Sequence, residues 1–421
     1  MQSRDRYVIE GERPLGGTVR VSGSKNGADY AMAVALLTTD DVIIENVPDI
    51  ADIRLMERIL ERLGAVVERP SASTMRINAA TVTTTEAPPE LVVQLRASFL
   101  VMGALLARFR RAASCAPGGD VIGIRPLDVH FAGFRALGAA VERRGDLFYA
   151  EAPRLRGAKV VLDYPSVMGT LNVLLAATLA DGTTTIVNAA AEPEVSAVGD
   201  LINAMGGRVD GAGTHTIVVE GVRELRGAMH RVIPDRLEAG TFALAAAITG
   251  GDVRIDGAVP GHVDALLWKL REAGVQTEEC EGGVRVRGGG GYRAVTAQAL
   301  PFPGLATDLQ PQLAAFLTQA RGVSVIHERV YDNRLLYVGE LRKMGADIVT
   351  AGQTAIVSGP TPLFGTMVRA LDVRAGAALV LAALAARGRT VITDVYHIER
   401  GYEALHAKLR SIGAAIERTS A

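Results

Sequence analysis

The feature that most restricts the fold of this chain is a glycine that recurs at nearly even spacing along its length. Each such glycine ends a predicted amphipathic helix and precedes a strand-like segment; they are Gly64, Gly138, Gly206, Gly274, Gly345 and Gly413, spaced 74, 68, 68, 71 and 68 residues apart. Glycine readily adopts the left-handed conformation that closes a helix and lets the chain turn back into a strand. The sequence therefore predicts six α/β repeats.

Each repeat is expected to contain two helices and three or four strands, too few to bury its own apolar faces. Segments rich in alanine and leucine, such as 175–180 and 381–386, lie between the glycines, and helices this apolar are buried. The repeats should therefore share cores, three to a lobe. Proline disfavours helix in the residue before it, so Arg231–Asp235 is the predicted crossover between two lobes, and a cleft between lobes is the expected ligand site.

The charge balance excludes several classes of partner. The chain has 45 basic and 46 acidic residues and a formal net charge of -1, so no uniform field attracts nucleic acid or an anionic membrane surface. It shows no export signal and no apolar stretch of membrane-spanning length. Its two cysteines, Cys115 and Cys280, cannot form a disulfide framework or a zinc site and suit a reducing compartment. We therefore expect a cytoplasmic protein.

Lys25 and Asn26 lie between a predicted strand and a predicted helix. Free amide groups and an ammonium at such a position form an anion site, although a plain turn with an exposed lysine fits the spacing equally well. Only five of the 45 basic residues are lysines, so a lysine at this position favours function somewhat.

The loop 115–126 is the most informative segment of the N-terminal half. Its glycines predict mobility, and Asp120 and Arg125 add an acid and a fixed cation. It is not a P-loop, because no Gly-Lys-Ser/Thr follows. Asp128 and His130 could bind a metal, but without further clustered ligands a structural hydrogen-bonding role is favoured.

Charged residues also follow predicted strand ends in the C-terminal half. Asp308 precedes a predicted helix, where it could equally act as a helix cap. Each arginine there would on its own more often form a surface ion pair than bind a ligand. Five arginines nevertheless come from several repeats in the two lobes, and their convergence would bind a small polyanion, because guanidinium groups pair with carboxylate and phosphate oxygens. They are Arg96, Arg125, Arg334, Arg374 and Arg400.

Seven short motifs, in the same order, closely resemble those of the UDP-N-acetylglucosamine 1-carboxyvinyltransferases in the enolpyruvyl-transferase superfamily. The motifs are Gly23–Asn26, Leu95–Ser98, Pro117–Asp120 with Gly123–Asp128, Thr307–Gln310, Asp332–Arg334, Asp372–Ala375 and Tyr396–Tyr402. The resemblance, which spans essentially the whole chain, implies a two-lobed inside-out α/β barrel with three βαβαββ units per lobe. One implied lobe is 25–233 with the mobile catalytic loop 115–126. The other is 1–24 plus 236–421, and the substrate cleft lies between them.

The resemblance also implies an activity. The enolpyruvyl (carboxyvinyl) group of phosphoenolpyruvate passes to the 3′-hydroxyl of UDP-N-acetylglucosamine with release of phosphate. This is the first committed step of peptidoglycan precursor synthesis and serves cell wall biogenesis, cell shape and cell division. The chemistry needs an acid, a base and anion stabilisation. The resemblance implies no metal, organic cofactor, nucleic acid, membrane or obligatory protein partner.

Residue roles carry over position by position. The residues that resemble catalytic residues are Asp120, Asp308, Lys25 and Arg400, with Asp308 taking the proton from the sugar hydroxyl. The implied substrate-binding residues are Lys25, Asn26, Arg96, Arg125, Pro126, Leu127, Asp128, Val129, Ser166, Val167, Gly169, Asp308, Val330, Arg334, Asp372, Arg374 and Arg400. Within this set, Arg125–Val129 and the turn Ser166–Gly169 resemble the cradle for the uridine diphosphate.

Asp120 stands where the family usually has cysteine. Cys115 is not its substitute, because it lies five positions earlier, and we interpret it as an ordinary buried small residue. A carboxylic acid can donate a proton if loop closure and burial raise its pKa, although nearby arginines oppose that shift. We expect proton transfer to be kept and the enzyme to be insensitive to fosfomycin, the epoxide that alkylates the usual cysteine.

Three alternatives stay open on the sequence. The closest is another enolpyruvyl transferase, either 3-phosphoshikimate 1-carboxyvinyltransferase or a paralogue with a different acceptor, although the Arg125 loop and Tyr396–Tyr402 favour the nucleotide-sugar enzyme. RNA 3′-phosphate cyclase has a similar repeated fold but needs an activating histidine that these motifs lack. A non-catalytic binding paralogue would explain Asp120 as decay, which the retention of Asp308 and the five arginines disfavours.

Overall fold

The structure, a computed structural model, describes residues 5–420, and these form two compact units. The N-terminal unit comprises Gly23–Gly119 and Arg125–Ile233. The C-terminal unit comprises the described residues up to Ser22, the segment Asp120–Ile124, and the described residues from Pro234 on. Residues 1–4 and 421, which the sequence prediction placed in the second lobe, lie outside the described residues.

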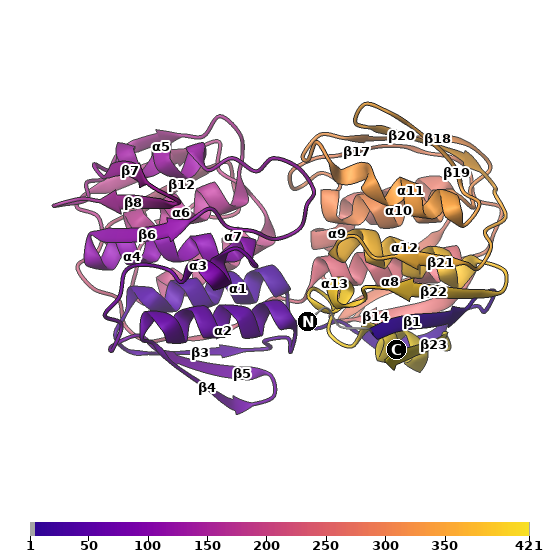
Figure 1. Cartoon of the computed structure of the whole chain (residues 1–421), viewed down its shortest axis with the longest axis horizontal. Helices are drawn as coiled ribbons and strands as arrows, with labels where there is room; N and C mark the ends of the chain where they lie inside the picture. The colour runs from indigo at the N-terminus through magenta and orange to yellow at the C-terminus, as the bar shows by residue number, and fades with distance from the viewer. Residues whose placement is uncertain (1–4, 421) are drawn as a thin grey trace. The chain divides into compact units, whose positions relative to one another are not determined.

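The N-terminal unit contains three sheets and the helices α1 to α7 (Figure 1). The first sheet has the strand order β13 (Met229–Arg231), β3 (Asp41–Glu45), β5 (Thr74–Asn78) and β4 (Val66–Ser71). The second has the order β6 (Arg111–Cys115), β8 (Leu147–Glu151) and β7 (Ala140–Arg144). The third has the order β11 (Val209–Asp210), β12 (Thr216–Glu220), β10 (Thr183–Val187) and β9 (Lys159–Val161). Its helices are α1 (Lys25–Val34), η1 (Ala35–Leu37), α2 (Ala51–Leu63), α3 (Pro89–Val92), η2 (Arg96–Leu100), α4 (Val101–Phe109), α5 (Asp128–Ala136), α6 (Val167–Thr178) and α7 (Pro193–Ala204).

The C-terminal unit repeats this plan. Its first sheet has the strand order β15 (Gln276–Cys280), β16 (Gly283–Arg287), β14 (Asp252–Asp256) and β2 (Gly16–Arg20). The second has the order β17 (Thr296–Ala299), β18 (Gly322–Glu328), β20 (Thr354–Gly359) and β19 (Asp347–Ala351). The third has the order β21 (Met367–Arg369), β22 (Arg389–Thr393), β1 (Asp5–Glu10) and β23 (Ala415–Ser420). Its helices are α8 (Arg236–Ile248), α9 (Pro260–Ala273), η3 (Thr307–Leu309), α10 (Gln310–Leu317), η4 (Arg334–Leu336), α11 (Tyr337–Lys343), α12 (Val373–Ala385), α13 (Tyr396–Glu399) and α14 (Leu405–Ser411). The predicted six-repeat α/β fold is confirmed.

The six marker glycines explain why the repeats look alike. All six have left-handed backbone, with φ between +94° and +104°. Gly64 and Gly274, for example, directly follow the last residues of α2 and α9, and each amide donates back to a carbonyl of that helix. A residue with a side chain would be strained at this conformation. The pattern in the sequence therefore marks real helix ends.

Apolar helices fill the centre of each unit. In the C-terminal unit α8, α10 and α12 pack on one another, with β17, β18 and β20 along one side and β1 and β22 along another (Figure 1). In the N-terminal unit α1 and α6 both pack against α4. These helices are rich in alanine, leucine and valine and are buried on nearly all faces, so the sheets enclose helices, as the inside-out barrel requires.

The N-terminal strand belongs to the C-terminal unit through backbone pairing. β1 runs antiparallel between β22 and β23, and β2 runs parallel to β14. Two backbone bonds mark the crossover, because Asp235 N donates to Ser22 O over 2.9 Å and Ser24 N donates to Ile233 O over 2.7 Å.

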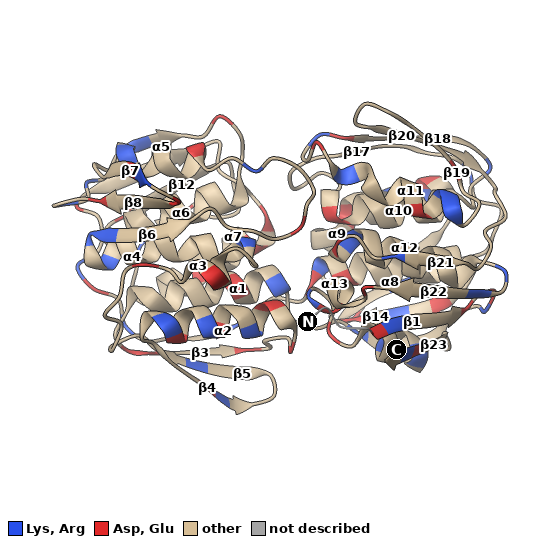
Figure 2. Ribbon diagram, in the orientation of Figure 1, with Lys and Arg blue, Asp and Glu red and all other residues tan. Residues whose placement is uncertain are grey.

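Acidic and basic residues are interspersed over the helices and strands of each unit (Figure 2). No helix between residues 5 and 420 is long and apolar enough to cross a membrane.

The loop 115–126 differs from its prediction. The sequence assigned all of it to the lobe 25–233, but Asp120–Ile124 clusters with the C-terminal unit. The physical reason is hydrogen bonding of its backbone to Asp332 and Asn333, more than 200 residues away in sequence.

Candidate active site

Asp308 is held between two buried arginines in the C-terminal unit. Its Oδ1 pairs with Arg334 Nη2, and its Oδ2 accepts from Arg374 Nε over 3.0 Å. The side chains of Arg334 and Arg374 are 1% and 4% exposed. Arg334 Nη1 also lies 3.9 Å from Asp372 Oδ1, so two carboxylates, those of Asp308 and Asp372, face the two guanidinium groups.

Three different elements supply this cluster. Asp308 lies in η3, Arg334 begins η4, and Arg374 lies in the first turn of α12. Asp372 caps α12, because its Oδ1 accepts the amides of Arg374 and Ala375 over 2.8 and 3.0 Å. Asp372 therefore has a structural task beside the substrate contact implied for it.

Glu328, at the end of β18, is a fully buried acid that the sequence reasoning missed. Its carboxylate accepts the amides of Val330 and Tyr331 over 2.8 and 3.1 Å, and Thr307 Oγ1 donates to it over 3.0 Å. Arg334 Nε in turn donates to Thr307 Oγ1 over 3.2 Å. Glu328 thus links Val330, a predicted substrate contact, through Thr307 to Arg334 of the Asp308 cluster. Its position in an alternating strand gave no signal of this role.

The electrostatics keep Asp308 ionised. Burial alone would raise its pKa, but the guanidinium groups of Arg374 and Arg334 hold the pKa of this carboxyl well below its usual range. Asp308 is therefore a carboxylate at neutral pH and is able to accept a proton.

Both arginines also have donor capacity left over. Arg334 Nη1 and Arg374 Nη1 are buried, and neither has a hydrogen-bond partner among residues 5–420. Buried donors without partners are costly, and a carboxylate or phosphate oxygen would satisfy them. The cluster therefore suits an anionic ligand placed next to a carboxylate base.

Asp120 lies beside Arg400 in the same unit. Arg400 directly follows α13, and its Nη1 lies 3.4 Å from Asp120 Oδ1. His397 is a close neighbour: burial lowers its pKa, and the carboxylate of Asp120 opposes that shift. The structure thus brings together two of the predicted catalytic residues.

Lys25 is the first residue of α1, which Ser24 caps by accepting the amide of Gly27 over 3.1 Å. Its ammonium lies 2.9 Å from Asp52 and 3.8 Å from Asp29. Both carboxylates are almost completely buried, so they fix the lysine side chain at the helix start. Asn26 follows in the same turn, where free helix amides face outward along the axis.

Arg96 and Arg125 meet in the N-terminal unit. Arg96 begins η2, and its Nη2 donates to the carbonyl of Arg125 over 2.6 Å. Gly119 sits against both, because a Cβ at this glycine would lie 3.2 Å from Arg125 Nη2 and 3.2 Å from Arg96 Cβ. The two predicted cations are therefore neighbours.

The two segments implied for the uridine diphosphate are also neighbours. Ser166 caps α6 and accepts the amide of Gly169 over 3.1 Å, so Val167 and Gly169 form its first turn. A Cβ at Gly169 would lie 2.9 Å from Val129, which lies in the first turn of α5. Asp128 and Pro126 are exposed beside it. A helix N-terminus facing an open loop suits a phosphate.

Asn172 forms hydrogen bonds to several of these segments, and the sequence analysis did not identify it. Its Oδ1 accepts Gly103 N over 2.8 Å, and its Nδ2 lies 3.1 Å from Phe99 O and 2.9 Å from His130 Nδ1. The network joins α6 to η2, α4 and α5. His130 has the expected hydrogen-bonding role. A signal existed, since an asparagine inside the apolar helix α6 needs partners when buried.

His130 gives a pH prediction. Burial lowers its pKa to about 3, so the folded protein keeps it neutral while the unfolded chain binds a proton below its ordinary pKa. Stability from this group is present above about pH 6.5 and is lost as pH falls toward 3. The free energy of unfolding of both proteins is compared at pH 6.5 and pH 5. Its fall between these two values should be about 2 kcal/mol smaller for His130→Gln than for the wild type. Urea unfolding at both pH values measures this, and equal losses would contradict it.

Cys115 ends β6 and is buried, with the pKa of its thiol raised by that burial. The interpretation of Cys115 as an ordinary buried residue is confirmed, because an un-ionised buried thiol is a poor nucleophile.

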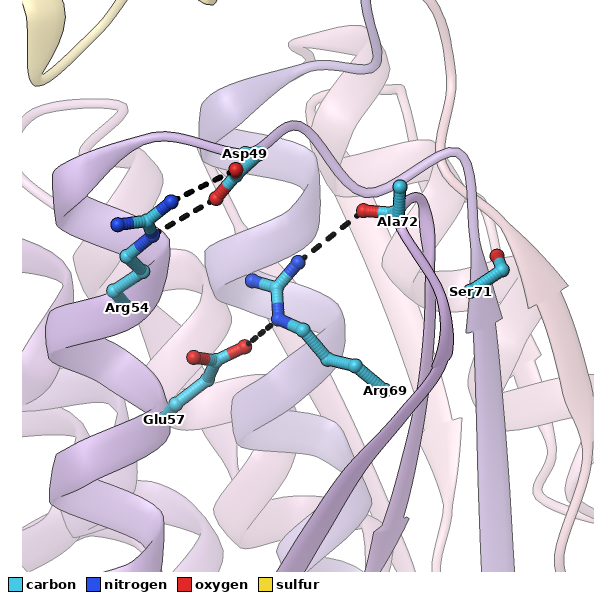
Figure 3. Close-up of a pocket in the computed structure, with 6 residues that line it drawn as sticks. All are labelled: Asp49, Arg54, Glu57, Arg69, Ser71 and Ala72. Atoms are coloured by element: carbon cyan, nitrogen blue, oxygen red, sulfur yellow. Dashed lines mark hydrogen bonds and ion pairs between the residues drawn. The ribbon is translucent and has the colours of Figure 1, made fainter.

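A pocket lies between α2 and the β4–β5 turn, and none of the predicted site residues lines it (Figure 3). It is lined by Asp49, Arg54, Glu57, Arg69, Ser71 and Ala72. Its arginines pair with its acids, because Arg54 donates twice to Asp49 and Arg69 donates to Glu57 and to the carbonyl of Ala72, although Arg69 Nη2 is buried without a hydrogen-bond partner among residues 5–420. The Asp308 cluster, in contrast, is built from three of the predicted site residues, Asp308, Arg334 and Arg374. No group of three or more potential metal ligands occurs within residues 5–420.

Comparison with known proteins agrees with this geometry. A family model described as EPSP synthase (3-phosphoshikimate 1-carboxyvinyltransferase) matches residues 9–409. The crystal structure of the enolpyruvyl transferase NikO from Streptomyces tendae superposes with a TM-score of 0.89 at 27% identity, covering 99% of each chain. An EPSP synthase from Acinetobacter baumannii shares the fold, with a TM-score of 0.75, 18% identity, and coverage of 99% of this chain and 100% of that chain. The chain belongs to the EPSP synthase family of enolpyruvyl transferases.

Within this family, curated relatives of one kind match over nearly full length. UDP-N-acetylglucosamine 1-carboxyvinyltransferase 1 of Caldanaerobacter subterraneus subsp. tengcongensis is 47% identical, over 99% of this chain and 100% of its own. The UDP-N-acetylglucosamine 1-carboxyvinyltransferase of Solibacter usitatus is 48% identical, over 98% of this chain and 99% of its own.

Proposed function

We propose that the protein transfers the enolpyruvyl group of phosphoenolpyruvate to the 3′-hydroxyl of UDP-N-acetylglucosamine and releases phosphate. It would act in the cytoplasm, in the first committed step of peptidoglycan precursor synthesis, and so serve cell wall biogenesis, cell shape and cell division. The observation that carries the proposal is Asp308, a carboxylate between two buried arginines that each keep an unused donor.

The reaction follows from these groups. Asp308 accepts the proton of the sugar hydroxyl as its oxygen attacks the phosphate-bearing carbon, and the methylene carbon receives a proton from Asp120. The resulting tetrahedral ketal loses a methyl proton and phosphate, which restores the vinyl group. Arg334, Arg374 and Arg400 stabilise the carboxylate and phosphate charges. An anion bound to the two buried arginines would also weaken their hold on Asp308 and make it a stronger base.

Lys25, Asn26, Arg96 and Arg125 supply further contacts for the anionic substrates. The α6 N-terminus at Ser166–Gly169, with Arg125–Val129 beside it, would hold the uridine diphosphate, because helix amides bind phosphate oxygens. Val330 and Asp372 complete the proposed set.

Phosphate release separates the candidate acceptors. We expect the protein to release phosphate from phosphoenolpyruvate when UDP-N-acetylglucosamine is added, and not when shikimate 3-phosphate is added. Release with the shikimate ester alone would assign the other acceptor. No phosphate release with either acceptor would support the non-catalytic paralogue.

The aspartate in the loop predicts resistance to fosfomycin. The wild type should keep its activity after incubation with the epoxide, because a carboxylate paired with Arg400 replaces the reactive thiol. Asp120→Cys should become sensitive and gain the mass of the inhibitor at residue 120. Cys115→Ala is the matched control, since the buried Cys115 should contribute no labelling in either background. Covalent inactivation of the wild type with mass added at Asp120 would refute the prediction.

A further inference from the structure

Asp332 and Asn333 hold the backbone of the segment Asp120–Ile124. Ile124 N donates to Asp332 Oδ1 over 2.9 Å. Asn333 N donates to Ile122 O over 3.1 Å, and Asn333 Nδ2 donates to Val121 O over 3.1 Å. Three hydrogen bonds thus hold a stretch of five residues, and every one of them is made to its backbone.

The fit at Gly123 supports a specific docking. Its φ is +135°, and a Cβ at this position would lie 1.9 Å from Asp332 Oδ1. Only glycine lets the carboxylate approach this closely.

One apolar side chain of this segment is packed against the protein. The side chains of Val121 and Ile124 are 74% and 80% exposed, and Ile122 alone among the apolar residues of the segment is buried. The segment is therefore held by its backbone bonds to Asp332 and Asn333, by the buried Ile122 and by the pair between Asp120 and Arg400.

The same two residues are next to the Asp308 cluster in sequence. Tyr331 is fixed on one side by Glu328, and Arg334 is fixed on the other by Asp308 and Thr307. Asp332 and Asn333 lie between these anchors, so their positions are set by the site. Asp120, at the start of the held segment, lies 3.4 Å from Arg400.

We propose that Asp332 and Asn333 are positioning residues that place Asp120 for proton transfer. They act through the loop backbone and touch neither substrate. This inference rests on the proposed function for its catalytic consequence, whereas the attachment itself stands on the hydrogen bonds alone.

The test compares Asp332→Ala and Asn333→Ala with Asp332→Asn, which keeps an oxygen acceptor for the Ile124 amide. Each alanine variant should lower kcat by about 5- to 10-fold, the effect of the one side-chain hydrogen bond that it removes, with the KM for phosphoenolpyruvate changed by less than about 2-fold. Asp332→Asn should restore most of kcat.

Two control variants remove comparable bonds elsewhere. Asp40→Ala deletes a carboxylate that accepts Gly227 N over 3.1 Å, and Asn203→Ala deletes an amide that makes two bonds to Val209. Both should leave kcat unchanged.

Hydrogen exchange separates failure of this inference from failure of the proposed function. The Ile124 amide should exchange faster in Asp332→Ala than in the wild type, whether or not any acceptor is turned over. Unchanged exchange would overturn the attachment. Faster exchange with unchanged kcat in an active enzyme would overturn the positioning role. A wild type that releases no phosphate would overturn the proposed function, and with it the catalytic role given to Asp332 and Asn333.

Discussion

Asp308→Asn is expected to lower kcat by about 1,000-fold, within the range found for loss of a general base. The substitution keeps the shape of the side chain but removes its charge. Arg374 then loses the carboxylate that accepts from its Nε, and Arg334 keeps only that of Asp372, 3.9 Å away, so an anionic substrate meets less competition for both arginines. The KM for phosphoenolpyruvate should therefore stay the same or fall while kcat collapses.

The same change should destabilise the folded protein without substrate, because two buried guanidinium groups lose their carboxylate, a loss of about 3–5 kcal/mol. Saturating phosphoenolpyruvate should restore part of this stability, since it binds only the folded state. Asp41→Asn is a suitable control, because Asp41 also pairs with an arginine, Arg76 at 3.0 Å, but outside the proposed site. Steady-state kinetics and urea unfolding measure both effects. An Asp308→Asn enzyme with wild-type kcat would exclude Asp308 as the base.

Asp120→Asn is expected to abolish turnover, with kcat falling by at least about 100-fold, because an amide cannot deliver the proton to the methylene carbon. Asp120 Oδ1 lies 3.4 Å from Arg400 Nη1, so the two side chains form an ion pair in the folded protein. A substrate phosphate bound to Arg400 would compete with Asp120 for that cation and make protonation easier.

Asp120→Cys is the matched variant for this prediction. It removes the carboxylate and the ion pair as Asp120→Asn does, but it keeps a group that can donate a proton. We expect the cysteine variant to turn over and the asparagine variant not to. If both lose activity equally, the ion pair with Arg400 and not proton transfer would be the function of Asp120.

The repeated architecture could be read from the sequence because it depends on local geometry. Six glycines at nearly even spacing each need left-handed backbone, and each has it. The Ala-rich helices are buried for an equally local reason, since they have no polar face. Asp308, Arg334 and Arg374 were identified by motif, but spacing alone could not show that they share one cluster.

The placement of the catalytic loop could not be read in this way. Asp120 and Arg400 are 280 residues apart, and the bonds from Asp332 and Asn333 to the loop span 208 and 212 residues. Nothing in the local sequence of Asp120–Ile124 encodes those partners, because the loop offers them only backbone groups. Glu328 could not be predicted for a related reason, since a polar residue inside a strand shows its role only when its partners are known. Asn172 did leave a signal, as an asparagine inside an apolar helix, but its partners could not be identified from the sequence.

The most direct test of the proposed mechanism is a mass spectrum of the nucleotide sugar after incubation with phosphoenolpyruvate and the wild-type protein in deuterated water. Protonation of the methylene carbon followed by loss of a proton from the resulting methyl group predicts UDP-N-acetylglucosamine carrying an added enolpyruvyl group, with solvent deuterium in its vinyl position. An unmodified nucleotide sugar would contradict the proposed acceptor, and an enolpyruvyl product without deuterium would contradict proton transfer to carbon as the step that Asp120 serves.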